Sequence, residues 1–577
     1  MNIINLKFTG NNNCMFLIFL NWIYIFITAK NFGVLFTKIL NIETYNVVIL
    51  QVLGLFFYAI ITSIFAFFFR IHIEYYVIIL IINIFLIFKF KLRIKENLNA
   101  IVKSFNTFKT SYKILFFLFF LIVLAQSATK PYLLDNESYY IQTIKWINEY
   151  GYVKGLANLH LFLGQNSTWH ALQAGFNFSF ISNYFNDING FVFVLMGFLF
   201  IEKLNKTTLK NQIQEYSLGF VLVFSLFFMQ FVNAPSPDLI IFLVTPYICY
   251  LFILNFKSIT ISDFKIILSL VLFLCLVKVT MLVLALLVVI LFLKNYRLLK
   301  SGMLQYIIIS TLVLVLFLSK NFIISGYLFY PTHVFDILNV DWKLPKALLQ
   351  LYENGTYQAG MNNTDVSHLS FFEKIKYWIQ IPKLHGLFNK IYLLLIFIFP
   401  CFLAIKKNYR HPLLIIYILA ILQFVIVWFN SPQYRFFFVF IIILALQIFT
   451  ALFKTHKIGV YLIYVSVLLS AIPIFITIDL NTFTNNNFAM ELNTFKLKNM
   501  IVPEENTKTE TKFTKQSIDG FEYYSPSEAV FFWATGNGDL PCVNKKQVDY
   551  IKSYYKYVPQ MRTNHLKDGF ESVLIDK

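Results

Sequence analysis

The chain has 577 residues, of which 58% are hydrophobic, 19% aromatic and 13% charged, and its mean hydropathy is +0.66. Soluble proteins carry about 25% charged residues, so this composition excludes an ordinary water-soluble enzyme, a disordered chain and a collagen-like fibre. The sequence therefore predicts a membrane protein, and the open question is its kind.

The net charge of +19 belongs to the apolar part of the chain. Residues 479–577 hold 12 Lys/Arg and 13 Asp/Glu, so the polar tail contributes nothing to the positive excess. A nucleic-acid-binding protein would gather its basic residues in one compact module. Basic residues spread over short loops between apolar segments are typical of membrane topology instead, and we expect no nucleic-acid partner.

Apolar runs of membrane-spanning length predict an all-α polytopic core. We count about 14 of them, each near the roughly 20 residues that cross a bilayer. They lie near residues 14–29, 47–69, 74–88, 114–128, 188–202, 216–232, 239–255, 264–277, 279–293, 303–319, 390–405, 412–429, 436–453 and 458–478.

The loops give the orientation. Segment 89–113 holds seven Lys/Arg against one Glu, so the positive-inside rule places it in the cytoplasm. Alternation from there places loops 129–187 and 320–389 and the tail on the outer side. Trp169–Phe185 is aromatic but dotted with polar residues, and it predicts an amphipathic helix lying in the membrane interface.

Three regions follow from this topology. Residues 1–113 form N-terminal membrane helices and the basic loop, residues 114–478 form the membrane core, and residues 479–577 form a small extracytoplasmic module of α/β or mainly β structure. We expect a bacterial inner-membrane protein of multi-pass topology with its tail outside the cytoplasm.

No metal site is predicted. Four of the five cysteines lie in apolar runs, and Cys542 stands by itself in the polar tail. His160 and His170 have no third ligand at metal spacing, so we interpret them as polar contacts rather than zinc ligands.

The first candidate site residues follow the apolar run 114–128. Asp135 and Glu137 lie two residues apart at the predicted membrane surface, beside Tyr139. Carboxylates placed there can take a proton from an acceptor hydroxyl or hold a divalent metal. Helix capping is the structural alternative, because an Asp or Glu in a first turn is favoured by the helix dipole.

Asp238 and Lys278 are the next candidates. Asp238 begins an apolar run after Pro235 and Pro237, where it can be either a cap or a second acid of the site. Lys278 has apolar sequence on both sides, and a lysine in mid-membrane is costly. Two helices that meet at the outer surface with Lys278 at their turn would avoid that cost, and a snorkelling lysine is the alternative.

Three further candidates lie at predicted outer helix ends. Lys320 and Asn321 follow the run 303–319, and Arg435 lies in a tight turn before the run 436–453. The positive-inside rule selects against an arginine on the outer side. Arg binds phosphate in a bidentate manner, so Arg435 is either a phosphate ligand or the partner of a nearby acid.

Together these features resemble the GT-C superfamily of integral-membrane glycosyltransferases, which take sugars from polyprenyl-phosphate donors. The resemblance implies an inverting enzyme with Asp135 as the base, Glu137 and Asp238 as further acids, and Lys278 and Arg435 as donor-phosphate ligands. It implies no nucleotide cofactor, and no nucleotide-binding fingerprint is present.

From about residue 114 to its end, the chain also resembles an uncharacterised family of large bacterial membrane proteins. The motifs are Asp135–Tyr140, Pro235–Asp238, Lys320–Tyr327 with Tyr330-Pro331, Asp341-Trp342, Ser431–Phe436, and Leu540–Cys542 with Leu566–Phe570. The chain departs from the family where Phe532-Trp533 replaces an expected Cys-Trp pair, which would leave Cys542 without a disulfide partner.

The expected function is transfer of a sugar from a lipid-linked donor to an envelope glycan, lipid or protein. Two alternatives remain open. A transporter or flippase for lipid-linked glycans would place charged residues near mid-membrane and break its helices in related halves. A non-catalytic envelope scaffold would keep the candidate residues apart.

Overall fold

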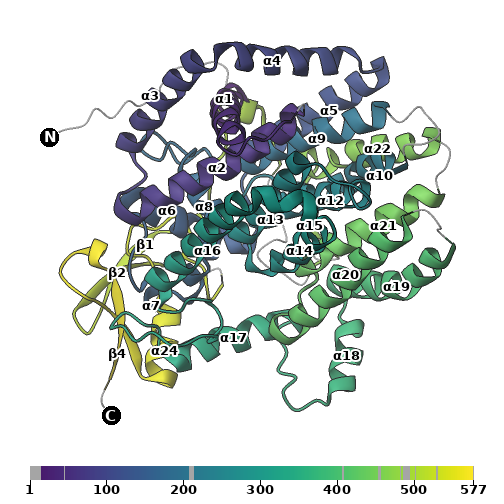
Figure 1. Cartoon of the computed structure of the whole chain (residues 1–577). Coiled ribbons are helices and arrows are strands. Elements are labelled where there is room, and N and C mark those ends of the chain that lie inside the picture. The colour runs from purple at the N-terminus through teal and green to yellow at the C-terminus, as the bar shows by residue number, and fades with distance from the viewer. Residues whose placement is uncertain are drawn as a thin grey trace.

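The computed structural model describes residues 15–44, 46–206, 213–405, 409–452, 456–480, 483–484, 494–500, 502–527 and 531–575. It is about 70% helical. Figure 1 shows long helices packed side by side, with a small β region at one end. We call the side that carries the described residues between 494 and 575 the tail side.

Ten helices within the described residues are long and apolar enough to cross a membrane. Seven of these are built on single elements: α1 (Met15–Ile39), α2 (Val47–Phe68), α5 (Thr110–Ser127), α9 (Ile188–Lys206), α12 (Pro237–Leu254), α19 (Lys383–Ile405) and α20 (Arg410–Asn430). Three are composite: α10 (Ile213–Gly219) continues through η3 (Phe220–Phe224), α11 (Ser225–Phe228) and η4 (Met229–Phe231), α15 (Tyr296–Leu299) and η6 (Lys300–Gly302) lead into α16 (Met303–Ser325), and α22 (His456–Leu469) continues into α23 (Ile472–Phe475). The protein is therefore a multi-pass membrane protein.

The predicted count of about 14 spans is not confirmed, because four of the predicted apolar runs form shorter helices. These are α3 (Ile73–Lys89), α13 (Ile261–Val277), η5 (Val279–Leu284) with α14 (Ala285–Lys294), and α21 (Phe438–Leu452). A 17-residue helix such as α3 or α13 rises only about 25 Å, which is less than the roughly 30 Å of a hydrocarbon core.

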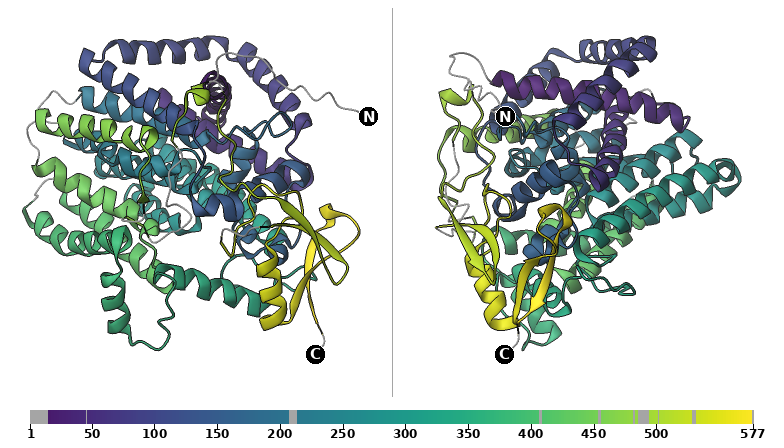
Figure 2. Two further views of the ribbon diagram at one scale, coloured as in Figure 1. Left: turned by 180° about the vertical axis from the view of Figure 1, so that it is seen from behind. Right: turned by 90° about the vertical axis from the view of Figure 1, so that its left-hand side faces the viewer.

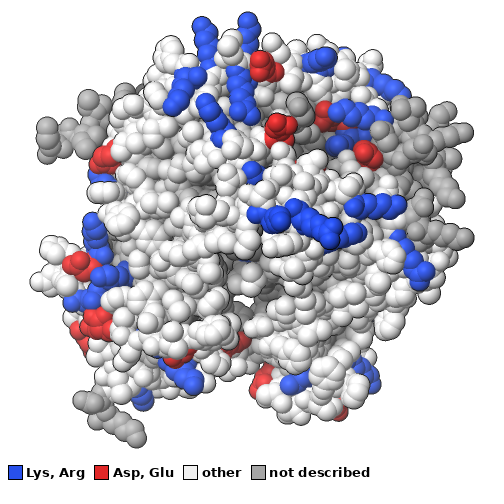
Figure 3. Space-filling model, in the orientation of Figure 1, with Lys and Arg blue, Asp and Glu red and all other residues white. Residues whose placement is uncertain are grey.

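Burial separates inner helices from outer ones. In α12, 94% of the apolar window is buried, whereas the corresponding values are 33% for the segment that contains α16 and 28% for α19. The outer helices expose apolar side chains, and Figure 3 shows a broad surface of uncharged residues, with Lys and Arg mostly at the top, in a row across the right half and along the left edge. Such a surface fits a lipid bilayer. The basic helix α4 (Lys91–Asn106) lies along the top edge in Figure 1.

The helix break predicted at Lys278 is confirmed. Lys278 follows α13 with extended backbone angles, and η5 begins at the next residue. Helices α13 and α14 pack against each other, so Lys278 occupies the turn between two helices rather than the middle of one. Helix α16 is preceded by α15 (Tyr296–Leu299) and η6 (Lys300–Gly302).

The loop after α5 folds into short helices under the tail. They are η1 (Asn136–Tyr140), α6 (Ile141–Tyr150), α7 (Leu156–Leu159), η2 (Leu161–Gln165) and α8 (Thr168–Ala174). The predicted amphipathic helix Trp169–Phe185 is wrong, since α8 ends at Ala174 and is fully buried. Protein contacts replace the expected lipid contacts: the Trp169 indole donates to Asn189, and the Tyr76 hydroxyl donates to the Ala174 carbonyl.

The tail forms two antiparallel hairpins. Strand β1 (Phe513–Ile518) pairs with β2 (Phe521–Pro526), and β3 (Tyr557–Met561) pairs with β4 (Phe570–Leu574). Asp519 and Gly520 both have positive φ in the first turn, where an Asp-Gly pair is favoured. Helix α24 (Lys545–Tyr555) and the short turns η10 (Leu497–Met500) and η11 (Leu566–Asp568) complete the tail.

The tail packs against the core rather than standing apart from it, as Figure 2 shows from two further sides. The Phe570 amide donates to the Lys154 carbonyl, and Asp341 pairs with Arg562. The loop that contains Asp341 also carries α17 (Lys346–Gly360) and α18 (Phe371–Gln380). Within the described residues, Cys542 is a free, buried thiol.

Candidate functional site

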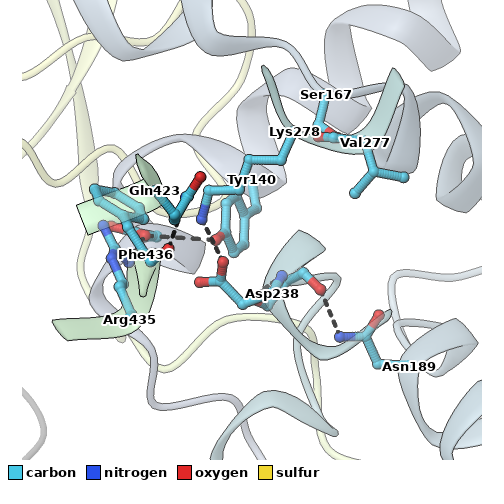
Figure 4. A network of polar contacts seen from close by, with 11 residues as sticks. Tyr140, Ser167, Asn189, Asp238, Val277, Lys278, Gln423, Arg435 and Phe436 are labelled. Carbon is cyan, nitrogen blue, oxygen red and sulfur yellow. Dashed lines mark hydrogen bonds and ion pairs between the residues drawn. The ribbon is translucent and has the colours of Figure 1, made fainter. Parts of the chain in front are cut away.

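Four charged side chains from four separate segments meet on the tail side. Asp135 precedes η1, Asp238 lies in the first turn of α12, Lys278 follows α13, and Arg435 belongs to η7 (Tyr434–Phe436). Figure 4 shows Asp238, Lys278 and Arg435 around the rings of Tyr140 and Phe436. We call Asp135, Asp238, Lys278 and Arg435 the four-charge cluster.

Arg435 pairs with Asp135 across 300 positions of sequence. Its Nη1 contacts Asp135 Oδ2, and the two side chains are 29% and 16% exposed. The same Oδ2 accepts a longer hydrogen bond of 3.4 Å from the Tyr140 hydroxyl. Burial and the charge of Asp135 raise the pKa of Tyr140 well above its ordinary value, so this hydroxyl stays protonated and acts as a donor.

Lys278 pairs with Asp238 in a more enclosed setting. The Lys278 ammonium contacts Asp238 Oδ1, and the two side chains are 18% and 3% exposed. The N-cap of α12 is Ser236, whose hydroxyl accepts from the Asp238 amide at 3.3 Å. The carboxylate of Asp238 is therefore directed to Lys278, and the capping role considered from the sequence falls to Ser236.

Phe436 connects the two ion pairs. Its ring centroid is 4.3 Å from Lys278 Nζ and 5.1 Å from Arg435 Cζ, so both cations lie near one aromatic ring. Gln423 donates to the Phe436 carbonyl at 3.0 Å. Burial by itself would lower the pKa of Arg435, but Asp135 and Asp238 hold it well above its ordinary value, so the guanidinium keeps its charge.

Glu137 has a different environment from Asp135. Its side chain is fully buried, and its two oxygens accept from the Thr507 hydroxyl at 2.9 Å, the Lys508 amide at 2.8 Å and the Thr509 hydroxyl at 2.7 Å. Its carbonyl accepts from the amides of Thr535 and Gly536. We call this attachment of the tail to Glu137 the tail clasp.

The other predicted substrate-binding residues lie beside these two groups. Tyr139 stacks on Phe162 with ring centroids 5.7 Å apart. Lys320 Nζ is 3.4 Å from the Thr168 hydroxyl. Asn321 donates to the Leu328 carbonyl at 3.2 Å, which fixes the chain after α16.

Sequence reasoning did not assign roles to Tyr140 or Phe436, and it interpreted His170 only as a polar contact. Tyr140 and Phe436 stand next to candidate residues in the motifs Asp135–Tyr140 and Ser431–Phe436. Nothing in the sequence shows, however, that the Phe436 ring would lie near both cations or that the Tyr140 hydroxyl would contact an acid. His170 packs on Tyr140, with ring centroids 4.7 Å apart. His160 accepts from the Phe162 amide at 3.2 Å. Within the described residues, no group of three His, Cys, Asp or Glu side chains is arranged to hold a metal ion.

These observations define a multi-pass membrane protein with a buried cluster of paired charges at the ends of its helices. A family model described as "Domain of unknown function (DUF8201)" matches residues 15–442, and the chain belongs to that family. All four residues of the four-charge cluster lie inside the matched range, whereas the tail donors of the clasp lie beyond it. No curated protein and no solved structure matches the chain.

Proposed function

We propose that the protein is a membrane glycosyltransferase that moves a sugar from a polyprenyl-phosphate donor to an envelope acceptor. The single observation that carries the proposal is the four-charge cluster, in which two acids and two cations from distant parts of the sequence meet at helix ends. A phosphate-linked donor and a hydroxyl acceptor require this combination of a base and cations.

Asp135 is the general base of the proposed reaction. It is the more exposed of the two paired acids, so an acceptor hydroxyl reaches it more readily than it reaches Asp238. The acceptor oxygen attacks the anomeric carbon while its proton passes to Asp135. The bond from that carbon to the phosphate oxygen breaks, the electron pair leaves with the polyprenyl phosphate, and the single displacement inverts the anomeric configuration.

Arg435 and Lys278 supply positive charge for the leaving phosphate. Arg435 holds Asp135 in the resting protein, and movement of its guanidinium toward a phosphate would free the carboxylate for its role as base. Asp238, which is almost completely enclosed, positions Lys278. Glu137 positions the η1 segment through the tail clasp and takes no part in proton transfer.

A lipid-linked donor also needs access from the bilayer. Figure 3 shows a hollow in the uncharged surface, between the places that α16 and α20 occupy in the same view in Figure 1. The η5 segment that follows Lys278 packs against α20. A polyprenyl chain in this hollow would bring its phosphate toward the four-charge cluster, on the outer side of a bacterial inner membrane.

A transfer assay tests the proposal against its two alternatives. The full-length protein is reconstituted in vesicles with radiolabelled polyprenyl-phosphate sugars and an envelope extract as acceptor. A glycosyltransferase forms a new glycosidic bond and releases polyprenyl phosphate, and Asp135→Asn should stop this. Movement of intact lipid-linked glycan across the bilayer without a new bond would indicate a flippase, and neither activity would indicate a scaffold.

A further inference from the structure

The buried residues next to the four-charge cluster include a lysine that forms no ion pair with a described carboxylate. Lys320 lies near the end of α16 and is 3% exposed. Its ammonium contacts the Thr168 hydroxyl at 3.4 Å, and within the described residues it forms no ion pair with any carboxylate. Lys278 and Arg435, by contrast, each contact an aspartate.

A buried lysine without an acid is either neutral or charged at a cost, because its ammonium has lost its hydration and keeps only the Thr168 hydroxyl at 3.4 Å and the Phe317 ring at 5.9 Å. A lysine kept in this state is poorly explained by stability. It is well explained by an anion that arrives with a ligand and completes the pair.

His170 provides a second unsatisfied group in the same place. It is fully buried, and neither ring nitrogen makes a hydrogen bond of normal geometry with the described residues. The Pro235 carbonyl lies close enough to affect the ring, but burial and then Lys320 lower the pKa of His170 to about 3. The imidazole is therefore neutral and has one N–H to donate.

Tyr140 links Lys320 and His170 to the proposed base. Its ring packs against His170, with centroids 4.7 Å apart, and its hydroxyl reaches Asp135 Oδ2. Thr168, the contact of Lys320, directly follows Ser167, whose hydroxyl donates to the Val277 carbonyl at 2.6 Å beside Lys278. The unpaired cation and the four-charge cluster are thus held by the same short segments.

Asp135 and Asp238 are already paired with Arg435 and Lys278, so an anion beside Lys320 would complete the pairing of the combined site. We infer that Lys320, His170 and Thr168 form a phosphoryl-binding subsite, in which the ammonium, an imidazole N–H and a hydroxyl hold the oxygens of a phosphate group. The phosphate belongs either to a polyprenyl-phosphate lipid or to free phosphate. The inference rests on the proposed function only for its choice of lipid, because the unpaired groups call for an anion whatever the reaction.

The test is a binding experiment that needs no transfer activity. Full-length protein in detergent is titrated with undecaprenyl phosphate, with undecaprenol, which lacks the phosphate, and with inorganic phosphate and pyrophosphate. The lipid phosphate should bind at least about tenfold more tightly than undecaprenol, which corresponds to about 1.4 kcal/mol. Binding of inorganic phosphate with equal affinity would identify the free anion as the ligand.

Lys320→Met should remove the preference for the phosphorylated lipid and lower its affinity at least about tenfold. The same variant should melt at the same temperature as the wild type or higher without ligand, because an unpaired buried charge has been removed. His170→Phe and Thr168→Val should each weaken binding by less. Lys154→Met, which changes an exposed lysine, is the matched control and should bind as the wild type does.

Undiminished lipid-phosphate binding by Lys320→Met, together with a lower melting temperature, would overturn the inference and show that Lys320 is structural. This failure is distinguishable from failure of the proposed function. If binding depends on Lys320 but no sugar is transferred, the subsite stands and the transferase proposal falls. If transfer depends on Asp135 but lipid-phosphate binding does not depend on Lys320, the transferase proposal stands and the subsite falls.

Discussion

The four-charge cluster contains Asp135 and the tail clasp contains Glu137, two residues further along the chain, yet the two carboxylates have opposite environments. Asp135 contacts one guanidinium and one hydroxyl through a single oxygen and stays partly exposed. Glu137 is fully buried, and three donors from the tail occupy its oxygens. A carboxylate with a free oxygen and access to solvent can accept a proton, whereas one with saturated oxygens is a structural anchor.

The largest effect that this comparison predicts is on transfer. Asp135→Asn keeps the size of the side chain but removes the base, so the rate should fall at least about 100-fold, the usual lower range for loss of a general base. The melting temperature should fall less than that of Asp238→Asn, because Asp135 and Arg435 are more exposed than Asp238 and Lys278. Release of labelled polyprenyl phosphate measures the rate.

Asp341→Asn is the matched control, because Asp341 also pairs with an arginine but is 54% exposed. It should transfer sugar at the wild-type rate. Equal activity of the Asp135 and Asp341 variants would show that Asp135 is not the base.

Glu137→Ala should instead act on stability. Three donors of the tail would lose their acceptor inside the protein, at a cost of at least about 3 kcal/mol. We expect a lower melting temperature and faster proteolytic cleavage of the tail, followed on a gel. Glu137→Gln retains one acceptor oxygen, so its melting temperature should lie between those of the wild type and Glu137→Ala. If Glu137→Ala kept a protected tail and lost only activity, Glu137 would belong to the catalytic group.

Substitutions of Asp238 and Lys278 test whether the two buried charges stabilise each other directly. Asp238→Asn and Lys278→Met should each destabilise the protein by about 3 kcal/mol, because each leaves a buried charge without its partner. The double variant should recover most of that loss, which a cycle of melting temperatures measures. Strictly additive effects would contradict a direct pair. The exposed pair of Asp341 and Arg562 should show a coupling below about 1 kcal/mol.

Asp187 is a third carboxyl to compare, with few hydrogen-bond donors around it. Its predicted effect, a pH-dependent change in stability, is the smallest. It is fully buried, and Asn21 donates to its Oδ1 at 3.0 Å. Burial raises its pKa from 3.8 to about 7. The folded protein thus binds this proton more tightly than the unfolded chain, so the stabilisation is complete below 3.8 and is lost as the pH rises through about 7.

Asp187→Asn stays neutral at every pH and tests this prediction. Its melting temperature relative to the wild type should rise between about pH 4 and about pH 7, since over that range only the wild type must take up a proton on folding. A constant difference over that range would mean that Asp187 is already ionised in the folded protein.

Hydropathy and charge were sufficient to predict a helical multi-pass membrane protein, since the cost of unsatisfied backbone groups in lipid forces long apolar runs into helices. They also predicted the break at Lys278, because a lysine in mid-membrane is penalised. The predicted number of spans is not confirmed, and the helix predicted at Trp169–Phe185 ends at Ala174. That segment packs on protein, and composition does not distinguish protein from lipid as the apolar neighbour.

The sequence by itself selected Asp135, Asp238, Lys278 and Arg435 as charges at helix ends, but it counted Glu137 with Asp135 among the catalytic acids. Only the tertiary structure separated them, because the three donors that occupy Glu137 come from the tail, about 370 residues further along the chain. The same holds for Lys320, whose lack of an acid depends on what the fold places around it. Local sequence determines which residues carry charge, whereas their pairing depends on contacts between distant segments that no local pattern encodes.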